Sequence, residues 1–593
     1  MSGDGATAPS APPATRFHAE HAAGRSWWAN AVVYQIYVRS FADGDGDGIG
    51  DLAGIRSRLP YLQALGADGL WLTPCFPSPQ HDHGYDVADY FAIEPTYGTL
   101  AGFDALLSDA HRLGLRVLLD VVPNHCSSEH AWFRAALAAG PGSAERQRFY
   151  FRDGRGPGGT EPPNNWISTF GGPAWTRITE ADGSPGQWYL HTFAPEQPDL
   201  DWDHPEVAEH FDRMLTFWFD RGVDGFRADA VTALGKAPGL PDATAEDLLA
   251  DRNLLCRWRP EGHVAWRRWR RLVDDYERRH PGRQLVLVAE AYTPLRPDLL
   301  RQYANRDEFH QAFSFDLMLA PWRADAWRRA IAESVEALED EGVLPTWTLN
   351  NHDTQRSVTR YGRADAEHHE AWTSNLVPSA APVDVERGTR RARAALLAVA
   401  ALPGNLYLYQ GEELGLPEVT DLPDAIRQDP VFHRSNGALP GRDGCRIPLP
   451  WTADERTAFG FSSAAPDIPN GMGTAAGGPA PTWLPQPTGW GRFAADVQAG
   501  KETSMLELYR RTLAARRHWL HEHPAGLAWL PAPPGVLLFA RGALLVAINL
   551  SGADAQLDPA VVRHRQVLLS SVPDHRDRAV VPHDGAIWLA PAG

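Results

Sequence analysis

Three carboxylates stand at the ends of short runs in this 593-residue sequence. Asp229 follows the run GFRA, Glu290 follows VLVA, and Asp353 ends the polar string NNHD. Two carboxyl groups about 5–5.5 Å apart can cleave a glycosidic bond with retention, because one attacks the anomeric carbon while the other protonates the leaving oxygen. These residue types therefore indicate sugar chemistry if the fold brings them together.

The neighbours of two of these carboxylates predict different roles for them. Arg227 lies two residues before Asp229, on the same side of an extended strand, and its charge should keep that aspartate ionised. Glu290 lies in the apolar string VLVAEAY, where burial should raise its pKa so that it holds a proton. We therefore expect Asp229 to be the nucleophile and Glu290 to be the general acid/base.

The strands and helices that must position these residues can be predicted from two kinds of segment that alternate along the chain. Short β-branched runs alternate with longer amphipathic stretches, which is typical of parallel strands joined by crossover helices. Eight such runs predict an α/β protein with a (β/α)8 TIM barrel, in which polar residues at the carboxyl ends of the strands meet on one face. The predicted strands are 31–41, 67–74, 115–125, 223–231, 285–291, 313–319, 345–353 and 405–413.

The spacing of these runs also predicts how the chain is divided. Residues 1–24, rich in Ala, Pro, Gly and Ser, are expected to form a disordered tail. The third and fourth strands are separated by more chain than one helix needs, which predicts an inserted subdomain over 126–200. The barrel would then take 25–125 and 201–522, and short strands with turns predict an antiparallel C-terminal β-sandwich over 523–593.

Four strings resemble the signature regions of glycoside hydrolase family 13, and they occur in the order of that family. They are DVVPNH (120–125), GFRADAV (225–231), VAEA (288–291) and NNHD (350–353). Other strings resemble the α-glucosidase and oligo-1,6-glucosidase branch, among them GYDVADY, NNWISTFGG, YLHTFAPEQPDLDW, YQGEELG and GRDGCRIPLPW. The resemblance covers the chain from about residue 26 to its end, and it implies the same barrel and a retaining α-glucosidase.

The resemblance also implies roles for individual residues. Asp229 would be the nucleophile, Glu290 the acid/base, and Asp353 the carboxylate that holds sugar hydroxyls and stabilises the oxocarbenium-like state. Ala230 would favour α-1,4 links, because α-1,6-specific members of the branch usually carry Val after the nucleophile. The other residues expected to bind the sugar are Asp82, Tyr85, His125, Phe170, Phe193, Gln197, Arg227, His352 and Arg442.

An acidic run, DGDGDGIGD, follows the first predicted strand. Alternating carboxylates suit a hard cation, but the run lacks the acidic twelfth residue of an EF-hand. It resembles instead the loop that holds one structural Ca²⁺ or Mg²⁺ in this branch, whereas the alternative is a solvated acidic turn without metal. No organic cofactor is expected. The expected ligands are Asp43, Asp45, Asp47, Asp51 and the carbonyl of Ile49.

The composition restricts the partners of the protein. A formal net charge of -18 argues against a nucleic-acid partner, which would need a basic face. Four cysteines far apart, without a CxxC pair, indicate reduced and mostly buried thiols. The first residues lack the features of a signal peptide, and no apolar run is long enough to span a membrane. We therefore expect a cytoplasmic protein that acts on small neutral glucosides.

The expected activity is exo-acting hydrolysis of terminal α-linked glucose through a covalent β-glucosyl-enzyme, with maltose-like α-1,4 links preferred. One alternative is an α-glucosyl-transferring relative, or one directed at sucrose, trehalose or α-1,6 links, because the choice of acceptor depends on the geometry of the rim. A barrel that has become an inactive scaffold is a different class. Such chains lack some catalytic carboxylates and often carry a membrane anchor, and this sequence keeps all three carboxylates. The sequence leaves the oligomeric state open.

Overall fold

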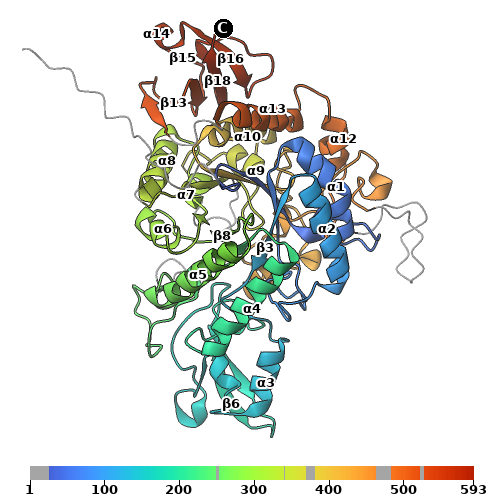
Figure 1. Ribbon diagram of the computed structural model, residues 1–593, viewed down its shortest axis with the longest axis vertical. Coiled ribbons are helices and arrows are strands. Elements are labelled where there is room, and N and C mark those ends of the chain that lie inside the picture. Colours follow the sequence, from blue (N-terminus) through green and yellow to red (C-terminus); the bar gives the residue numbers. More distant parts are fainter. Residues whose placement is uncertain are drawn as a thin grey trace, which may run out of the picture.

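The computed structural model describes residues 26–248, 253–339, 341–368, 381–462, 482–520 and 526–592. The predicted tail over 1–24 lies outside these residues. Figure 1 shows a central barrel, with a subdomain around helix α3 (Ala131–Ala139) at one end and the C-terminal strands at the other. Among the described residues, no helix is both long and apolar enough to cross a membrane.

Eight parallel strands form the barrel, which confirms the predicted fold class. Their order is β10-β11-β1-β2-β3-β7-β8-β9, and a single parallel bridge between Phe313 and Thr346 joins the two ends of this sheet. Their interior faces are filled by large side chains such as Trp71 and Tyr407. The strands are β1 (Val32–Ile36), β2 (Gly69–Leu72), β3 (Arg116–Val121), β7 (Gly225–Ala228), β8 (Val286–Ala289), β9 (Gln311–Ala312), β10 (Thr346–Thr348) and β11 (Asn405–Tyr409).

The prediction of a sixth strand over 313–319 is wrong, because the strand lies earlier in the chain and most of the predicted range is a helix. The barrel strand there is the two-residue β9, and the apolar run after it forms the helix α7 (Phe315–Leu319). A short apolar run fits a buried strand and a buried helix equally well, so its alternation alone cannot distinguish them. In the helix, Phe315 and Met318 stand three residues apart and both join the core inside the barrel.

The crossover helices pack around the outside of the barrel, and their ends follow from local sequence. Helix α4 (Pro205–Arg221), for example, has Pro205 at its first position and ends at Gly222, whose φ of 108° suits glycine. The other helices are α1 (Leu52–Leu65), α2 (Leu100–Arg112), α5 (His263–Arg279), α6 (Pro297–Tyr303), α8 (Ala324–Glu339), α9 (Ser357–Gly362), α10 (Val385–Ala401), α11 (Pro430–Arg434), α12 (Ala495–Gln498) and α13 (Met505–Leu520).

A small subdomain follows β3, as the sequence predicts. Besides α3 it contains a three-stranded antiparallel sheet in the order β4-β6-β5. The chain returns to the barrel beside the point where it left, because His125 and Asp199 form an antiparallel bridge. The subdomain therefore stands at the mouth of the barrel. Its strands are β4 (Phe151–Arg152), β5 (Trp175–Thr179) and β6 (Pro185–Leu190).

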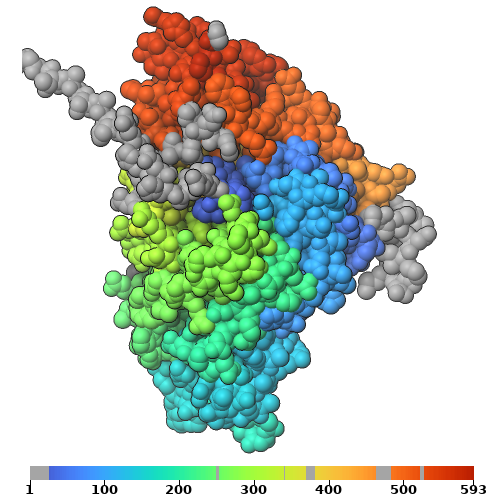
Figure 2. Space-filling view, in the orientation of Figure 1, coloured from blue at the N-terminus to red at the C-terminus, as the bar shows by residue number. Residues whose placement is uncertain are grey.

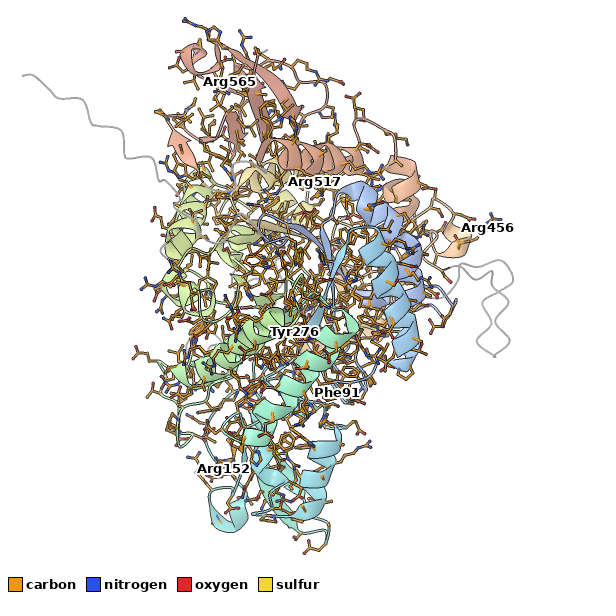
Figure 3. The ribbon with its side chains drawn as sticks, in the orientation of Figure 1. Phe91, Arg152, Tyr276, Arg456, Arg517 and Arg565 are labelled. Carbon is orange, nitrogen blue, oxygen red and sulfur yellow. The ribbon has the colours of Figure 1, made fainter. Side chains whose placement is uncertain are left out.

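An antiparallel unit follows α13 and packs on helix α10 of the barrel. In Figure 2 the C-terminal residues, coloured red, lie at one end of the molecule. The indole of Trp588 donates a hydrogen bond of 2.9 Å to the carbonyl of Leu397 in α10. Arg565 in this unit and Arg152 in the subdomain lie at opposite ends of the molecule (Figure 3). The predicted boundary at 522/523 falls among 521–525, outside the described residues. The five-stranded sheet contains β12 (Ala528–Leu530), β13 (Val536–Arg541), β14 (Leu544–Asn549), β18 (Gly585–Pro591) and β16 (Arg565–Ser570), and beside it lie β15 (Ala555–Gln556), β17 (Val580–Val581) and α14 (Pro559–Val562).

The four cysteines of the sequence are all buried and none forms a disulfide, as predicted. Cys445 donates weak hydrogen bonds from its sulfur to the carbonyls of His352 and Arg442, at 3.3 and 3.1 Å. It thus acts as a small packing residue beneath the loops that surround the barrel mouth.

Candidate active site

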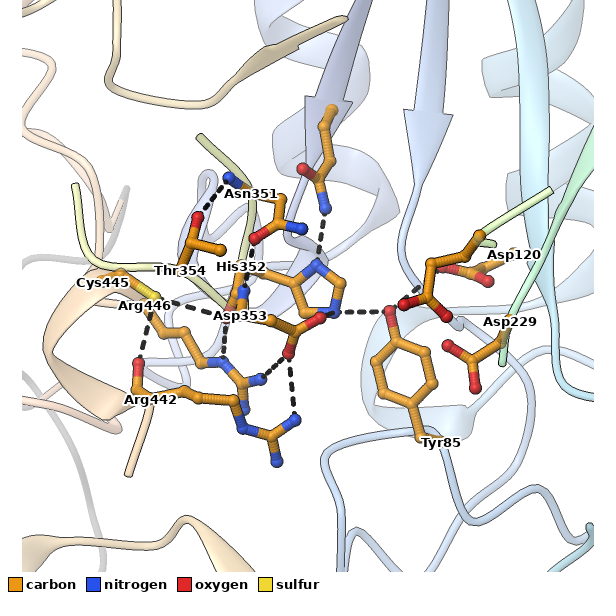
Figure 4. Close-up of polar contacts among 12 residues, drawn as sticks. Tyr85, Asp120, Asp229, Asn351, His352, Asp353, Thr354, Arg442, Cys445 and Arg446 are labelled. Carbon is orange, nitrogen blue, oxygen red and sulfur yellow. Dashed lines mark hydrogen bonds and ion pairs between the residues drawn. The ribbon is translucent and has the colours of Figure 1, made fainter. Parts of the chain in front are cut away.

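The carboxyl ends of neighbouring strands bring the predicted residues together. Strands β3, β7 and β8 are adjacent, and their register places Asp120 opposite Arg227. Asp229 and Glu290 each follow the last residue of their strand, at the ends of β7 and β8. Asp353 comes from the loop after β10. Figure 4 shows Asp353, Asp229 and Asp120 around the same space.

The Arg227 side chain is the centre of this arrangement, and it is almost fully buried. Its Nη1 lies 2.8 Å from Asp120 and 2.7 Å from Asp229, and its Nη2 lies 3.6 Å from Glu290. One guanidinium therefore holds three carboxylates from three neighbouring strands. Its position fixes the aspartate and the glutamate that the sequence assigns to the chemistry.

The protein shifts the pKa values of Asp229 and Glu290 in the same direction. Burial raises the pKa of both Asp229 and Glu290, and the positive charge of Arg227 opposes the rise in each case. The expectation that Arg227 alone keeps Asp229 ionised is therefore too simple, because burial and the neighbouring carboxylates outweigh it. Arg227 is nevertheless closer to Asp229 than to Glu290, which favours the ionised form of Asp229.

Ala230 contributes its backbone to the site. It has φ 47° and ψ 35°, a left-handed conformation that is uncommon outside glycine. In this conformation its amide donates a hydrogen bond of 2.7 Å to Oε2 of Glu290. The bond favours the ionised form of Glu290 and so opposes the effect of burial on its pKa.

Asp353 is held by positive and polar groups from two segments (Figure 4). Arg442 and Arg446 each contact its Oδ1 at 2.9 Å, and Nε2 of His352 lies 3.2 Å from Oδ2. Burial favours the neutral carboxyl, but these neighbours together hold the pKa of Asp353 well below its usual range. Asp353 is therefore ionised and faces the same space as Asp229.

The polar contacts continue from Arg442 toward the subdomain. Nη2 of Arg442 lies 2.8 Å from Asp82, and the amide of Gln197 donates to the other oxygen of Asp82 at 3.1 Å. Gln197 also lies 3.1 Å from Nε2 of His125. Burial raises the pKa of Asp82 to about 6, although the charge of Arg442 opposes this rise. Four of the predicted sugar-binding residues thus form one continuous polar chain.

Tyr85 and His352 form the floor between the two halves of the pocket. Their rings are stacked with an angle of 3° and centroids 5.3 Å apart, and the tyrosine hydroxyl lies 2.7 Å from Nε2 of His352. The same hydroxyl donates to Asp120 at 3.1 Å. At the rim, Phe170 and Phe193 pack edge to face with centroids 5.5 Å apart. Contacts thus link the predicted sugar-binding residues to one another and to the three carboxylates, with Phe170 beside Arg442 and Phe193 beside His125.

Two buried residues of the site were missed in the sequence. Arg446 contacts Asp353, and its Nε donates to the carbonyl of His352 at 2.8 Å. It stands four residues after Arg442 in the string GRDGCR, a spacing that could have suggested a shared role. Asp429 is fully buried and accepts bonds of 2.7 and 2.6 Å from the backbone and Nε of Arg442. It is the N-cap of α11, so the Asp-Pro pair marks a helix start, but nothing in its sequence neighbourhood marks it as a partner of Arg442.

The acidic loop between β1 and α1 lies apart from this pocket. Carboxylate oxygens of Asp43, Asp45 and Asp51 come within 4.8 Å of one another, which is close enough to share one ion. Backbone amides of the loop orient them: Gly48 donates to Asp43 at 2.9 Å. Asp47 does not belong to this group, and its Oδ1 accepts from the amide of Ile49 at 2.8 Å. An all-oxygen set with three negative charges fits Ca²⁺ or Mg²⁺.

The chain is similar to known carbohydrate enzymes along most of its length. The family model described as the alpha amylase catalytic domain matches residues 35–519. A probable alpha-glucosidase of Rhizobium meliloti (strain 1021) is 36% identical over 517 residues, covering 83% of both chains. The oligo-1,6-glucosidase of Parageobacillus thermoglucosidasius is 33% identical over 481 residues, which cover 75% of this chain and 78% of that enzyme. The crystal structure of the alpha-glucosyl transfer enzyme XgtA superimposes with a TM-score of 0.77 at 32% identity, covering 96% of this chain and all of the other.

Proposed function

The chain belongs to the α-amylase family, glycoside hydrolase family 13, and from this membership we propose that it is a retaining α-glucosidase. It would release the terminal glucose of short α-linked oligosaccharides. One observation carries the proposal: Arg227 lies 2.7 Å from Asp229 and 3.6 Å from Glu290, so two carboxyl groups from neighbouring strands meet at one guanidinium. This is the pair that a double displacement requires.

In the first step, Asp229 attacks the anomeric carbon while Glu290 gives its proton to the departing glycosidic oxygen. In the second step, the ionised Glu290 takes a proton from water, and the water oxygen displaces Asp229 from the sugar. The hydrogen bond from the amide of Ala230 supports Glu290 in its ionised form, which the second step needs. Asp353 supplies negative charge against the oxocarbenium-like sugar in both steps.

The polar chain of Asp82, Arg442, Gln197 and His125 suits the hydroxyls of a single terminal glucose. These side chains already bond to one another, so the sugar would find donors and acceptors held in fixed directions. A pocket built in this way recognises the end of a chain rather than its middle. We therefore infer exo-action on small neutral glucosides.

The acidic loop would hold one structural Ca²⁺ or Mg²⁺ through Asp43, Asp45 and Asp51. The burial that raises the pKa of the Asp51 carboxyl is a cost that a bound cation would offset. No organic cofactor is needed, because two carboxyl groups supply the acid, the base and the nucleophile.

Transfer of glucose to another sugar is the second candidate function. It is favoured by the similarity to the glucosyl transfer enzyme XgtA at 32% identity. Transfer and hydrolysis share the first step and differ only in whether water or a sugar hydroxyl attacks the intermediate. Chromatography of the products from maltose, isomaltose, sucrose and trehalose distinguishes them, because transfer yields new glucosides that are longer than the substrate or isomeric with it, whereas hydrolysis yields only monosaccharides.

Proton NMR of the first product tests the mechanism. A double displacement through Asp229 restores the starting configuration, so α-glucose should appear first and then convert to the β-anomer. Initial release of β-glucose would contradict the proposed roles of Asp229 and Glu290.

A further inference from the structure

Lys236 is one of only two lysines in a sequence whose other positive side chains are arginines. It lies seven residues after Asp229, beyond the short 3-10 helix η5 (Val231–Ala233), and its side chain is only 2% exposed. A buried ammonium group has three protons to donate and needs three acceptors. Lys236 has three: Asp199 at 3.0 Å, Asn124 Oδ1 at 2.9 Å and the carbonyl of Ala233 at 2.5 Å.

These acceptors come from three separate parts of the chain. Asn124 follows β3, Asp199 belongs to the segment that returns from the subdomain, and Ala233 belongs to the segment after the nucleophile. Asp199 is itself fully buried and accepts further bonds from the Thr192 amide at 2.9 Å and from the Thr192 hydroxyl. Lys236 therefore joins the end of β3, the subdomain and the catalytic segment at one point.

The contact with Lys236 fixes the orientation of the Asn124 amide. An ammonium group can only donate, so the oxygen of Asn124 must face Lys236 and its nitrogen must point away. That nitrogen donates to Asp199 at 3.1 Å and lies 3.1 Å from Nδ1 of His125. An N–H group directed at Nδ1 requires Nδ1 to be the unprotonated nitrogen of the imidazole ring.

The other nitrogen of His125 faces the sugar pocket. Nε2 lies 3.2 Å from the carbonyl of Tyr85, which can only accept, so Nε2 must carry the proton to bond to it. The Gln197 nitrogen, 3.1 Å from Nε2, donates to Asp82 and makes no hydrogen bond with a protonated Nε2. Burial lowers the pKa of His125 to about 4, so the ring is neutral near pH 7 and carries one proton. With Nδ1 unprotonated, that proton is on Nε2, which donates it to the carbonyl of Tyr85 in the protein without substrate.

We propose that Lys236 is a positioning residue that fixes the tautomer of His125 through the amide of Asn124, so that Nε2 of His125 keeps a proton that the bound sugar can share with the carbonyl of Tyr85. The role of this tautomer in catalysis rests on the proposed α-glucosidase function. The tautomer itself does not, because it is a property of the protein without substrate. An arginine could not replace Lys236 here, since the donors of its planar guanidinium do not radiate from one nitrogen as the three protons of an ammonium group do.

The test compares the wild type with Lys236→Met/Asp199→Asn. The double variant avoids the unpaired buried carboxylate that Lys236→Met alone would leave, so folding should be retained. Asn124 can then turn its amide over. Lys501→Met is the matched control, because Lys501 is exposed and no side-chain contact of it is seen in the described residues.

Histidine labelled with ¹⁵N distinguishes the tautomers by the long-range couplings of its ring, and the His125 signals are those that vanish in His125→Asn. The wild type and Lys501→Met should carry the proton on Nε2, whereas the double variant should carry it partly or mainly on Nδ1. Because a hydrogen bond to the sugar is then lost, KM for 4-nitrophenyl α-glucoside should rise about tenfold with a smaller change in kcat.

A wild-type proton on Nδ1, or an unchanged tautomer in the double variant, would overturn the inference. A folded double variant with both the tautomer and KM unchanged would leave Lys236 with a structural role only. Absence of any α-glucosidase activity in the wild type would instead contradict the proposed function, and the tautomer measurement would still decide the present inference.

Discussion

The substitution Ala230→Val tests whether the residue after the nucleophile determines which glycosidic linkage the enzyme prefers. Ala230 is 9% exposed, has a φ of 47° and donates its amide to Glu290 at 2.7 Å. Valine would place two more methyl groups at the point where the strand end bends into the rim. There they would narrow the space for the second sugar of an α-1,4-linked substrate.

Two effects of this substitution have to be separated. A β-branched residue in the left-handed region costs about 1–3 kcal/mol and can draw the amide away from Glu290. This cost lowers kcat/KM for every substrate alike, because Glu290 acts on all of them. Contact with the second sugar affects only the ratio between substrates, and one or two methyl groups are worth roughly 1–3 kcal/mol, or about 10- to 200-fold.

The assay measures kcat/KM for maltose and isomaltose in the wild type, in Ala230→Val and in Ala230→Gly. Glycine adopts the observed φ without strain and adds no side chain, so it should keep the preference for maltose. Valine should move the ratio toward isomaltose by about tenfold or more. A wild type that prefers isomaltose, or a ratio that valine leaves unchanged, would refute the reasoning, and the subdomain segment 164–200 would become the next candidate.

Three further predictions concern the chemistry and the metal. Asp229→Gly should lose several orders of magnitude in kcat and regain part of it with azide as external nucleophile, which gives β-glucosyl azide; β-glucosyl azide from a Glu290 variant instead would reverse the two roles. Arg227→Met should raise the pKa of Asp229 further, so the acid limb of kcat/KM should move to higher pH by about one unit or more, and less in Arg227→Lys. An acid limb that stays in place would show that Arg227 does not set this pKa. If loop 43–51 holds the proposed ion, chelation should lower Tm more than it lowers the activity of protein that is still folded. A metal that turnover requires, or elemental analysis without metal, would contradict a structural ion.

The sequence predicts the barrel and its mouth well, because both depend on local patterns. Strand ends are marked by a change from apolar to polar residues, and parallel strands place those ends on one face. The strand ends therefore mark Asp229, Glu290 and Asp353 as candidates from their position alone. The family resemblance then added residues from the loops, such as Asp82 and Arg442, whose sequence neighbourhoods show no strand pattern.

The parts that were missed depend on contacts between distant segments. Asp429 matters because it holds Arg442, and this pairing follows from the packing of a long irregular loop. The left-handed conformation of Ala230 is fixed by its surroundings, since alanine has no intrinsic preference for it. The apolar spacing over 313–319 fits both a strand and a helix, and the sequence alone cannot show that these side chains pack inside the barrel as a helix.

The burial of all four thiols makes the protein convenient for site-directed labelling. A thiol reacts as the thiolate, and burial raises the pKa of each native cysteine, so maleimide dyes should leave them unmodified in the folded protein. Cysteines introduced at the exposed positions Arg152 and Gln566 would then carry the dyes. Energy transfer between them would follow the distance from the subdomain to the C-terminal sheet during turnover, without first removing any native cysteine.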